Sequence, residues 1–193
     1  MLMLCQKKYD ISVLSILSHY DVWNVVPLQD KISYDDLSKK IGIPRSYIHR
    51  ILRHAMTRRV FWEPTPGYVA HTASSAAVAQ DSSLSAWIGH NIDEIGRALS
   101  WQAEALDKWG DTEDPSKTAF CLATQLPEGS TVFDFLQSDG EGEKKGWRAK
   151  RFGLAMAAIS KTGSFSSKHL HAGFDWSSLG EATLVDVCIP HNF

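Results

Sequence analysis

The residues that could hold a nucleotide-like ligand lie at the end of the chain. Leu184, Val185, Asp186 and Val187 follow Gly180 and predict a short apolar strand that contains an acid. In a doubly wound α/β domain, such a strand runs into a glycine-rich turn, where the backbone and the next helix N-terminus approach the ligand. Here the following residues are Cys188-Ile189-Pro190-His191-Asn192, which contain no glycine and include a proline without an amide donor. The sequence therefore predicts the first strand of a nucleotide domain without its binding turn.

Other chemistry-bearing residues form no recognisable motif. His169 and His171 alternate on a short segment, but no cysteine or carboxylate has ligand spacing to them. The chain has no nucleophile elbow, P-loop or HExxH motif. The odd number of widely spaced cysteines argues against both a disulfide framework and a zinc site: Cys5, Cys121 and Cys188. We therefore predict no catalytic residue and no metal site in this chain.

The elements ahead of that strand resemble a winged-helix arrangement. Apolar spacing from Ile11 to Val26 predicts a helix that ends before Pro27. Ser33 with Asp36 indicates a capping box for a short helix that stops at Gly42. A helix is then predicted over 45–58, followed by a hairpin between 60–63 and 68–71.

The predicted helix over 45–58 leaves two interpretations open. It is rich in basic side chains, as a DNA-recognition helix would be: Arg45, His49, Arg50, Arg53, His54, Arg58 and Arg59. A net charge of −2 and the long helices that follow favour a solvated structural helix instead. No run of residues is long and apolar enough to span a membrane, so we expect a cytoplasmic protein without nucleic-acid or membrane partners.

Two longer helices are predicted in the second half of the chain. The first covers 84–109, and its tryptophans are expected to be core or subunit-interface residues. The second covers Trp147 to Lys161, in which Phe152, Met156 and Ile159 either fill a helical core stripe or line a pocket.

Four segments resemble the small-molecule O-methyltransferases of fungal secondary metabolism, which use S-adenosyl-L-methionine (SAM). These segments are Trp62-Glu63-Pro64 through His71-Thr72, the T-x-F-x-x-A pattern at 118–123, the F-x-x-A-M…S pattern at 152–160, and 174–187. The departure from the family is at Cys188-Ile189, where the family has glycines.

The resemblance implies a mainly α fold in three parts. These are a winged-helix-like dimerisation domain (1–80), a helical region (81–173) and the truncated start of a Rossmann-like SAM domain (174–193). It also implies that Phe152 and Met156 line the cofactor pocket and that Ser160 reaches the amino-acid end of SAM. The family's catalytic base lies in a later segment that has no counterpart here.

From this resemblance we expect a chain that is inactive alone, binds no SAM by itself, and forms a homodimer or a heterodimer with a methyltransferase-type chain. The family's substrates are small aromatic or polyketide-like metabolites. Two alternatives remain. One is a non-catalytic dimerisation partner or coregulator of a biosynthetic cluster. The other is a longer gene product whose reading frame changes after Val187.

Overall fold

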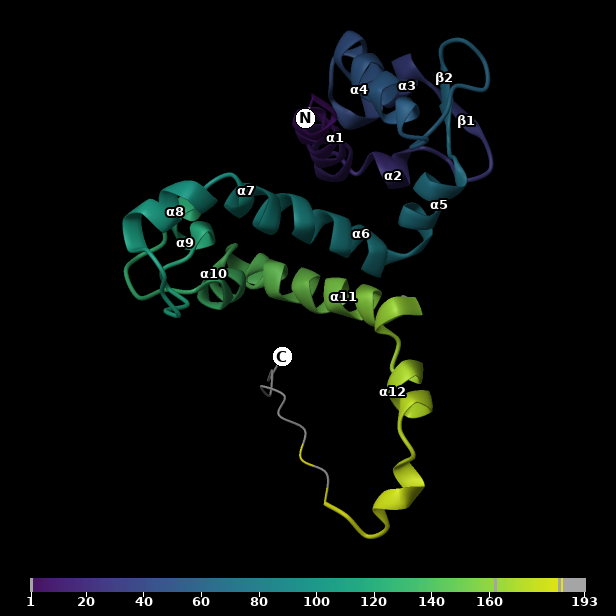
Figure 1. Ribbon diagram of the computed structural model, residues 1–193. Coiled ribbons are helices and arrows are strands. Elements are labelled where there is room, and N and C mark those ends of the chain that lie inside the picture. Colours follow the sequence, from purple (N-terminus) through teal and green to yellow (C-terminus); the bar gives the residue numbers. More distant parts are fainter. Residues whose placement is uncertain (1, 162, 184, 186–193) are drawn as a thin grey trace. The chain divides into compact units, whose positions relative to one another are not determined.

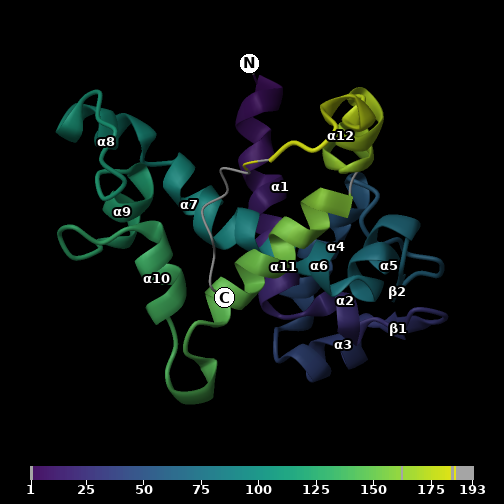
Figure 2. The same ribbon diagram turned by 90° about the horizontal axis from the view of Figure 1, so that it is seen from below.

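The computed structural model describes residues 2–161, with side chains from Lys7 onward, together with 163–183 and 185. The chain forms two compact units, Met1–Ala158 and Ile159–Phe193. Figure 1 shows the elements along the chain, and Figure 2 shows them from below.

The first unit opens with helices and two short strands. In chain order these elements are α1 (Leu2–His19), α2 (Val22–Val25), β1 (Lys31–Ser33), α3 (Tyr34–Ile41), α4 (Arg45–Thr57), β2 (Tyr68–Ala70) and α5 (Ala73–Gln80). Helix α4 lies against both α1 and α3, and α5 lies against α2 and α6.

Local sequence signals fix the bounds of α3. The Ser33 hydroxyl accepts a hydrogen bond from the Asp36 amide at 3.0 Å, which caps the helix N-terminus. At the other end Gly42 adopts a left-handed conformation with φ of 72°, which a residue with a Cβ rarely adopts. The predicted N-cap at Ser33 and the stop at Gly42 are therefore confirmed. The reciprocal half of the predicted capping box is not formed, because Asp36 accepts from the Ser33 hydroxyl rather than from the Ser33 backbone amide.

The predicted hairpin between 60–63 and 68–71 is wrong in its main partner. Strand β2 pairs antiparallel with β1, in the register Lys31 to Ala70 and Ser33 to Tyr68. Only Trp62 of the predicted first strand pairs with β2, through a single bridge to Ala70. The segment turns inward just before that bridge because Phe61 adopts φ of 62° and buries its ring against Trp23.

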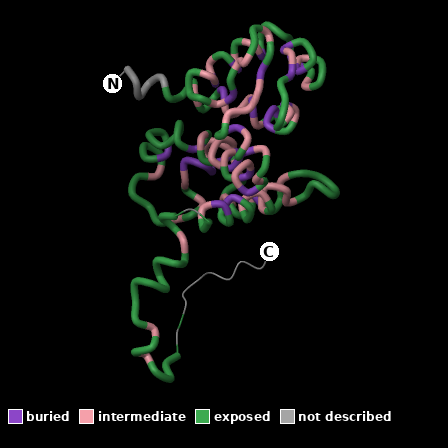
Figure 3. Tube along the Cα trace, turned by 90° about the vertical axis from the view of Figure 1, so that its right-hand side faces the viewer, coloured by how far each residue is buried: buried purple, intermediate pink, exposed green. Residues whose placement is uncertain are grey.

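The core of the first unit gathers around α1 to α4. The largest fully buried side chains in it come from α1 to α4 and from the segment before β2: Leu17, Trp23, Tyr34, Leu37, Ile48, Leu52 and Phe61. Figure 3 shows buried segments in purple along this part of the chain. Burying a side chain of this size stabilises the fold by about 1.5–3 kcal/mol. Helices α1 and α4 are thus held against each other by the packing of these buried side chains.

The rest of the first unit is helical. Its elements are α6 (Ser82–His90), the π-helix η1 (Asn91–Ile95), α7 (Gly96–Leu99), α8 (Gln102–Trp109), α9 (Ala119–Thr124), α10 (Val132–Ser138), the 3-10 turn η2 (Gly142–Lys144) and α11 (Trp147–Lys161). The bounds predicted for α11 are confirmed. The helix predicted over 84–109 is instead interrupted, first by η1 and then by a turn at Ser100 and Trp101.

Within the described residues of the second unit, the elements that follow the end of α11 are η3 (Gly163–Phe165), α12 (Lys168–Gly173) and η4 (Trp176–Leu179). The Trp176 indole donates to the Leu170 carbonyl at 3.1 Å and links the last two. The terminal strand predicted over 184–187 lies outside the described residues, apart from Val185, which is in no strand. Among the described residues, no helix combines the length and apolar character needed to cross a membrane.

Candidate functional site

The three residues predicted to contact a cofactor all lie on α11. Phe152 is half-buried, and its ring lies 5.1 Å from that of His90 and 6.2 Å from that of Phe133. Met156, one turn further along, is 37% exposed, and Ser160 is exposed. Phe152 is therefore part of an aromatic contact with α6 and α10, and its role toward a cofactor stays a prediction.

Beside Phe152 lies a group of charged side chains that sequence reasoning missed. We call it the ionic cluster, and it consists of His90, Asp93, Glu94, Asp139, Arg148 and Arg151. Its centre is Glu94, which is only 1% exposed. Glu94 Oε1 accepts from both Arg148 and Arg151, and Oε2 accepts from His90 Nδ1 at 3.0 Å.

The outer carboxylates of the ionic cluster complete the partners of the two arginines. Arg151 Nη1 donates to Asp93 at 2.6 Å, and Arg148 Nε donates to Asp139 at 2.5 Å. Both guanidinium groups also lie over the Trp147 ring, at 4.3 and 4.6 Å from its centroid. These contacts join α11 to α6, to η1 and to the end of α10. Figure 1 shows α11 running alongside α6.

Local backbone features allow this arrangement. Arg148 and Arg151 are three residues apart on α11 and so project from one face of it. A Cβ at Gly89 would lie 3.0 Å from Arg151 Nη1, so the missing side chain leaves room for the guanidinium. Glu94 lies within the π-helix, a wider turn that is often found at functional sites.

The pKa of Glu94 is lowered although the group is buried. Burial alone, the largest single influence, would raise it, but the hydrogen bond from His90 and the charges and hydrogen bonds of Arg151 and Arg148 together outweigh it. Glu94 is thus a fixed anion whose oxygens are both occupied. Such a group suits the positioning of α11 better than proton transfer.

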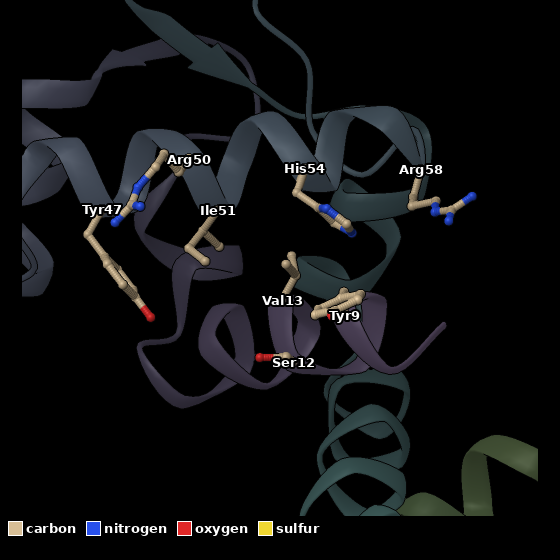
Figure 4. Close-up of a pocket in the computed structure, with 8 residues that line it drawn as sticks. All are labelled: Tyr9, Ser12, Val13, Tyr47, Arg50, Ile51, His54 and Arg58. Carbon is tan, nitrogen blue, oxygen red and sulfur yellow. The ribbon is translucent and has the colours of Figure 1, made fainter. Parts of the chain in front are cut away.

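A second feature is a groove between α1 and α4, shown in Figure 4. It has a volume of about 570 Å³ and is lined by Tyr9, Ser12, Val13, Tyr47, Arg50, Ile51, His54 and Arg58. Asp10 of α1 accepts hydrogen bonds from His54 at 2.8 Å and from Arg58 at 2.9 Å. Both hydrogen bonds lower the pKa of Asp10, that from Arg58 most, so its negative charge is maintained next to them.

Several basic residues of α4, inside and outside the groove, have acidic partners. Arg45 pairs with Asp35 at 3.0 Å, and Arg53 pairs with Glu63 at 3.0 Å. With Arg58 and His54 held by Asp10, most of the cations that suggested DNA recognition have acidic partners in the fold. Because α1 also covers one side of α4, the structure favours the interpretation of α4 as a structural helix. In the described part of the chain, no three potential ligand side chains gather as a metal site would require.

The sequence of this helical chain is similar to that of known proteins. No protein-family model matches the chain. It is 32% identical over 179 residues to the O-methyltransferase bik3 of Gibberella fujikuroi, a match that covers 92% of this chain and 37% of that protein. It is 33% identical over 177 residues to the O-methyltransferase PaMT of Phomopsis amygdali, which covers 92% and 39% of the two chains. The chain is a homologue of fungal O-methyltransferases.

This O-methyltransferase homologue spans about two fifths of the length of the curated relatives it matches. A chlorophenol O-methyltransferase of Trichoderma longibrachiatum, 31% identical, matches 95% of the chain and 38% of its own length.

Solved structures show the same fold at lower sequence identity. The crystal structure of OxaC in complex with S-adenosylhomocysteine (SAH) and oxaline superimposes with a TM-score of 0.69 at 20% identity, over 81% of this chain and 38% of that one. A pericyclic reaction enzyme superimposes with a TM-score of 0.66 at 18% identity, over 86% and 45% of the two chains. The fold of the homologue therefore occurs in proteins of different chemistry, and fold alone does not assign its reaction.

Proposed function

We propose that this chain provides the non-catalytic, helical part of an O-methyltransferase of fungal secondary metabolism. Residues 1–80 would form a winged-helix-like dimerisation domain, 81–173 a helical region, and 174–193 the entry into the SAM domain. The observation that carries this proposal is the alignment of 92% of the chain with about two fifths of proteins that are named O-methyltransferases. The helical fold shared with OxaC supports it.

Dimerisation is supported by exposed apolar side chains on α1 and α7. Ile11 is 45% exposed, and on α7 and its preceding turn Leu99 is 59% and Ile95 39% exposed. Ile11 lies next to α7, because a Cβ at Gly96 would be 4.0 Å from its Cγ2. We call these three residues the apolar patch. In contrast, Val13, Leu17 and Val22, which lie in the same α1–α2 segment as Ile11, are in the core.

Light scattering coupled to size exclusion tests the dimer. We expect a dimer for the 193-residue chain and a monomer for Leu99→Lys, because a buried ammonium would be unpaired at the interface. Arg97→Glu is the matched control, since Arg97 is exposed on the same short helix. A well-behaved monomer of the unaltered chain would refute this part of the proposal. Mixing with a full-length methyltransferase tests the alternative, a heterodimer in which this chain acts as partner or coregulator.

This chain contains residues that could contact SAM from one side only. Phe152 and Met156 of α11 could contact the nucleoside of SAM, and Ser160 could donate its hydroxyl to the amino-acid end, as the family resemblance implies. The backbone turn that would hold the other side is predicted to be missing, because Cys188 to Asn192 contain no glycine. We propose that the 193-residue chain does not bind SAM by itself. Micromolar binding in isothermal titration with SAM would refute this.

A further inference from the structure

The groove between α1 and α4 is separate from α11 and from the apolar patch. Tyr9, Ser12 and Val13 line it from α1. Ile11 of the apolar patch is two residues from both Tyr9 and Val13, and residues two apart on a helix do not share a face. The groove therefore stays open in the dimer proposed above. Its volume of about 570 Å³ is within the range of small-molecule sites.

The walls of the groove suit an aromatic ring. Tyr9 from α1 and Tyr47 from α4 are 56% and 42% exposed, and in Figure 4 their rings lie at different ends of the groove. Val13 and Ile51 give it an apolar floor. Aromatic and aliphatic side chains facing one cleft favour a flat apolar ligand.

The charges of the groove suit an anion. Its lining contains Arg50, His54 and Arg58 but no carboxylate. Arg58 and His54 donate hydrogen bonds to Asp10, which offsets part of their charge, whereas Arg50 makes no ion pair with any described residue and lies over the Tyr47 ring at 5.5 Å. A free guanidinium at the edge of an aromatic cleft matches a carboxylate, which it can bind with two parallel hydrogen bonds.

We propose that this groove binds a small aromatic carboxylate, with the ring between Tyr9 and Tyr47 and the carboxylate on Arg50. A smaller cavity of about 260 Å³ shares Val13, His54 and Arg58 with the groove, and Leu14, Ala55 and Val60 give it space for an apolar ring substituent. Asp10 also lines this cavity, so the carboxylate of the ligand is placed at the Arg50 end of the groove, away from Asp10. No covalent step is involved. The site is a binding site formed by α1 and α4.

Titration of the 193-residue chain with 2-naphthoate tests this, followed by ¹H–¹⁵N NMR and by calorimetry. We expect a Kd of about 1 mM or tighter, with shifts concentrated at 9–13 and 47–54. Arg50→Gln should weaken binding about fivefold to tenfold, because it removes one charge from an exposed site. Ser12→Trp should block binding by filling the groove. Ser12 and Arg50 are both exposed, so we expect both variants to fold.

Two controls make the test specific. Arg45→Gln, on the same helix but paired with Asp35 outside the groove, should bind 2-naphthoate as the unaltered chain does. The neutral 2-naphthamide should bind the unaltered chain and Arg50→Gln equally. The proposal is overturned if 2-naphthoate causes no saturable shifts up to about 10 mM, if the shifts lie elsewhere, or if Arg50→Gln and Ser12→Trp leave binding unchanged.

Discussion

Replacement of Glu94 by glutamine is the sharpest test of the ionic cluster. The change keeps the size of the side chain but removes its charge, so that Arg148 and Arg151 lose the carboxylate they share. An amide also places donors against donors, because the neighbours of Glu94 all donate to it. Breaking a buried ion pair on one side costs about 3–5 kcal/mol.

The structure places the expected loss at the lower end of that range. Asp93 and Asp139 remain as partners of the two arginines, and their side chains are 32% and 31% exposed. We therefore expect Glu94→Gln to lower the free energy of unfolding by about 3 kcal/mol, and the melting temperature by about 6–12 °C for a chain of this length. Urea unfolding followed by circular dichroism and tryptophan fluorescence measures both.

Glu104→Gln on α8 is the matched control, because Glu104 is exposed and makes no hydrogen bond to another element in the described part of the chain. It should change stability by less than about 0.5 kcal/mol. If Glu94→Gln and Glu104→Gln unfold alike, the cluster does not hold α11 in place and the reasoning from burial fails.

The pH dependence of unfolding tests the role of Glu94 in a second way. Since the pKa of Glu94 is lower in the folded than in the unfolded protein, its contribution is present above the ordinary glutamate pKa of about 4.3. It is lost as the pH falls through the folded-state pKa. The stability difference between the unaltered chain and Glu94→Gln should therefore be constant near neutral pH and shrink on acidification. A difference that grows toward low pH would contradict the assigned sign.

Three further changes have expected outcomes in the same unfolding assay. Ser33→Ala should cost about 1 kcal/mol because it leaves the Asp36 amide uncapped, whereas Ser33→Thr should keep most of the stability. Gly140→Ala should cost more than about 1 kcal/mol, since φ is 94° and the added Cβ would be 2.4 Å from the Lys144 carbonyl oxygen; a neutral result would show that this turn rearranges freely. Tyr34→Phe should be neutral or stabilising by up to about 1 kcal/mol, because the buried hydroxyl has no hydrogen-bond partner among the described residues; a loss above about 1 kcal/mol would indicate a bound water.

Elements with strong local signals were predictable from the sequence. The Ser33 cap, the Gly42 stop and the full extent of α11 follow from residues within a few positions of each boundary. The partner of β2 was not predictable in this way. Its pairing with Lys31 to Ser33 depends on distant segments, while the turn-rich 64–67 suggested a local hairpin.

The ionic cluster could not be derived because its partners are far apart in the sequence. Glu94 and Arg151 are separated by 57 positions. A weak signal existed in the acidic pair at 93–94, together with Arg148 and Arg151 at a spacing of three. Neither pattern says which face of which helix receives the other, since that is decided by packing.

The π-helix at Asn91–Ile95 also determines where this part of the chain tolerates a change in length. A wide turn accommodates one residue more than a regular helix would between the same two ends. If 82–99 were regular throughout at its present length, every side chain beyond the turn would rotate by about 100°, and Ala98, now 8% exposed, would leave the interior. Deleting Ile92 would convert the wide turn into a regular helical turn and keep both ends in place. An inserted residue could not be accommodated in this way, because the wide turn already contains one extra residue. Homologous sequences aligned across this helix should therefore show gaps at 91–95 and few insertions elsewhere in it.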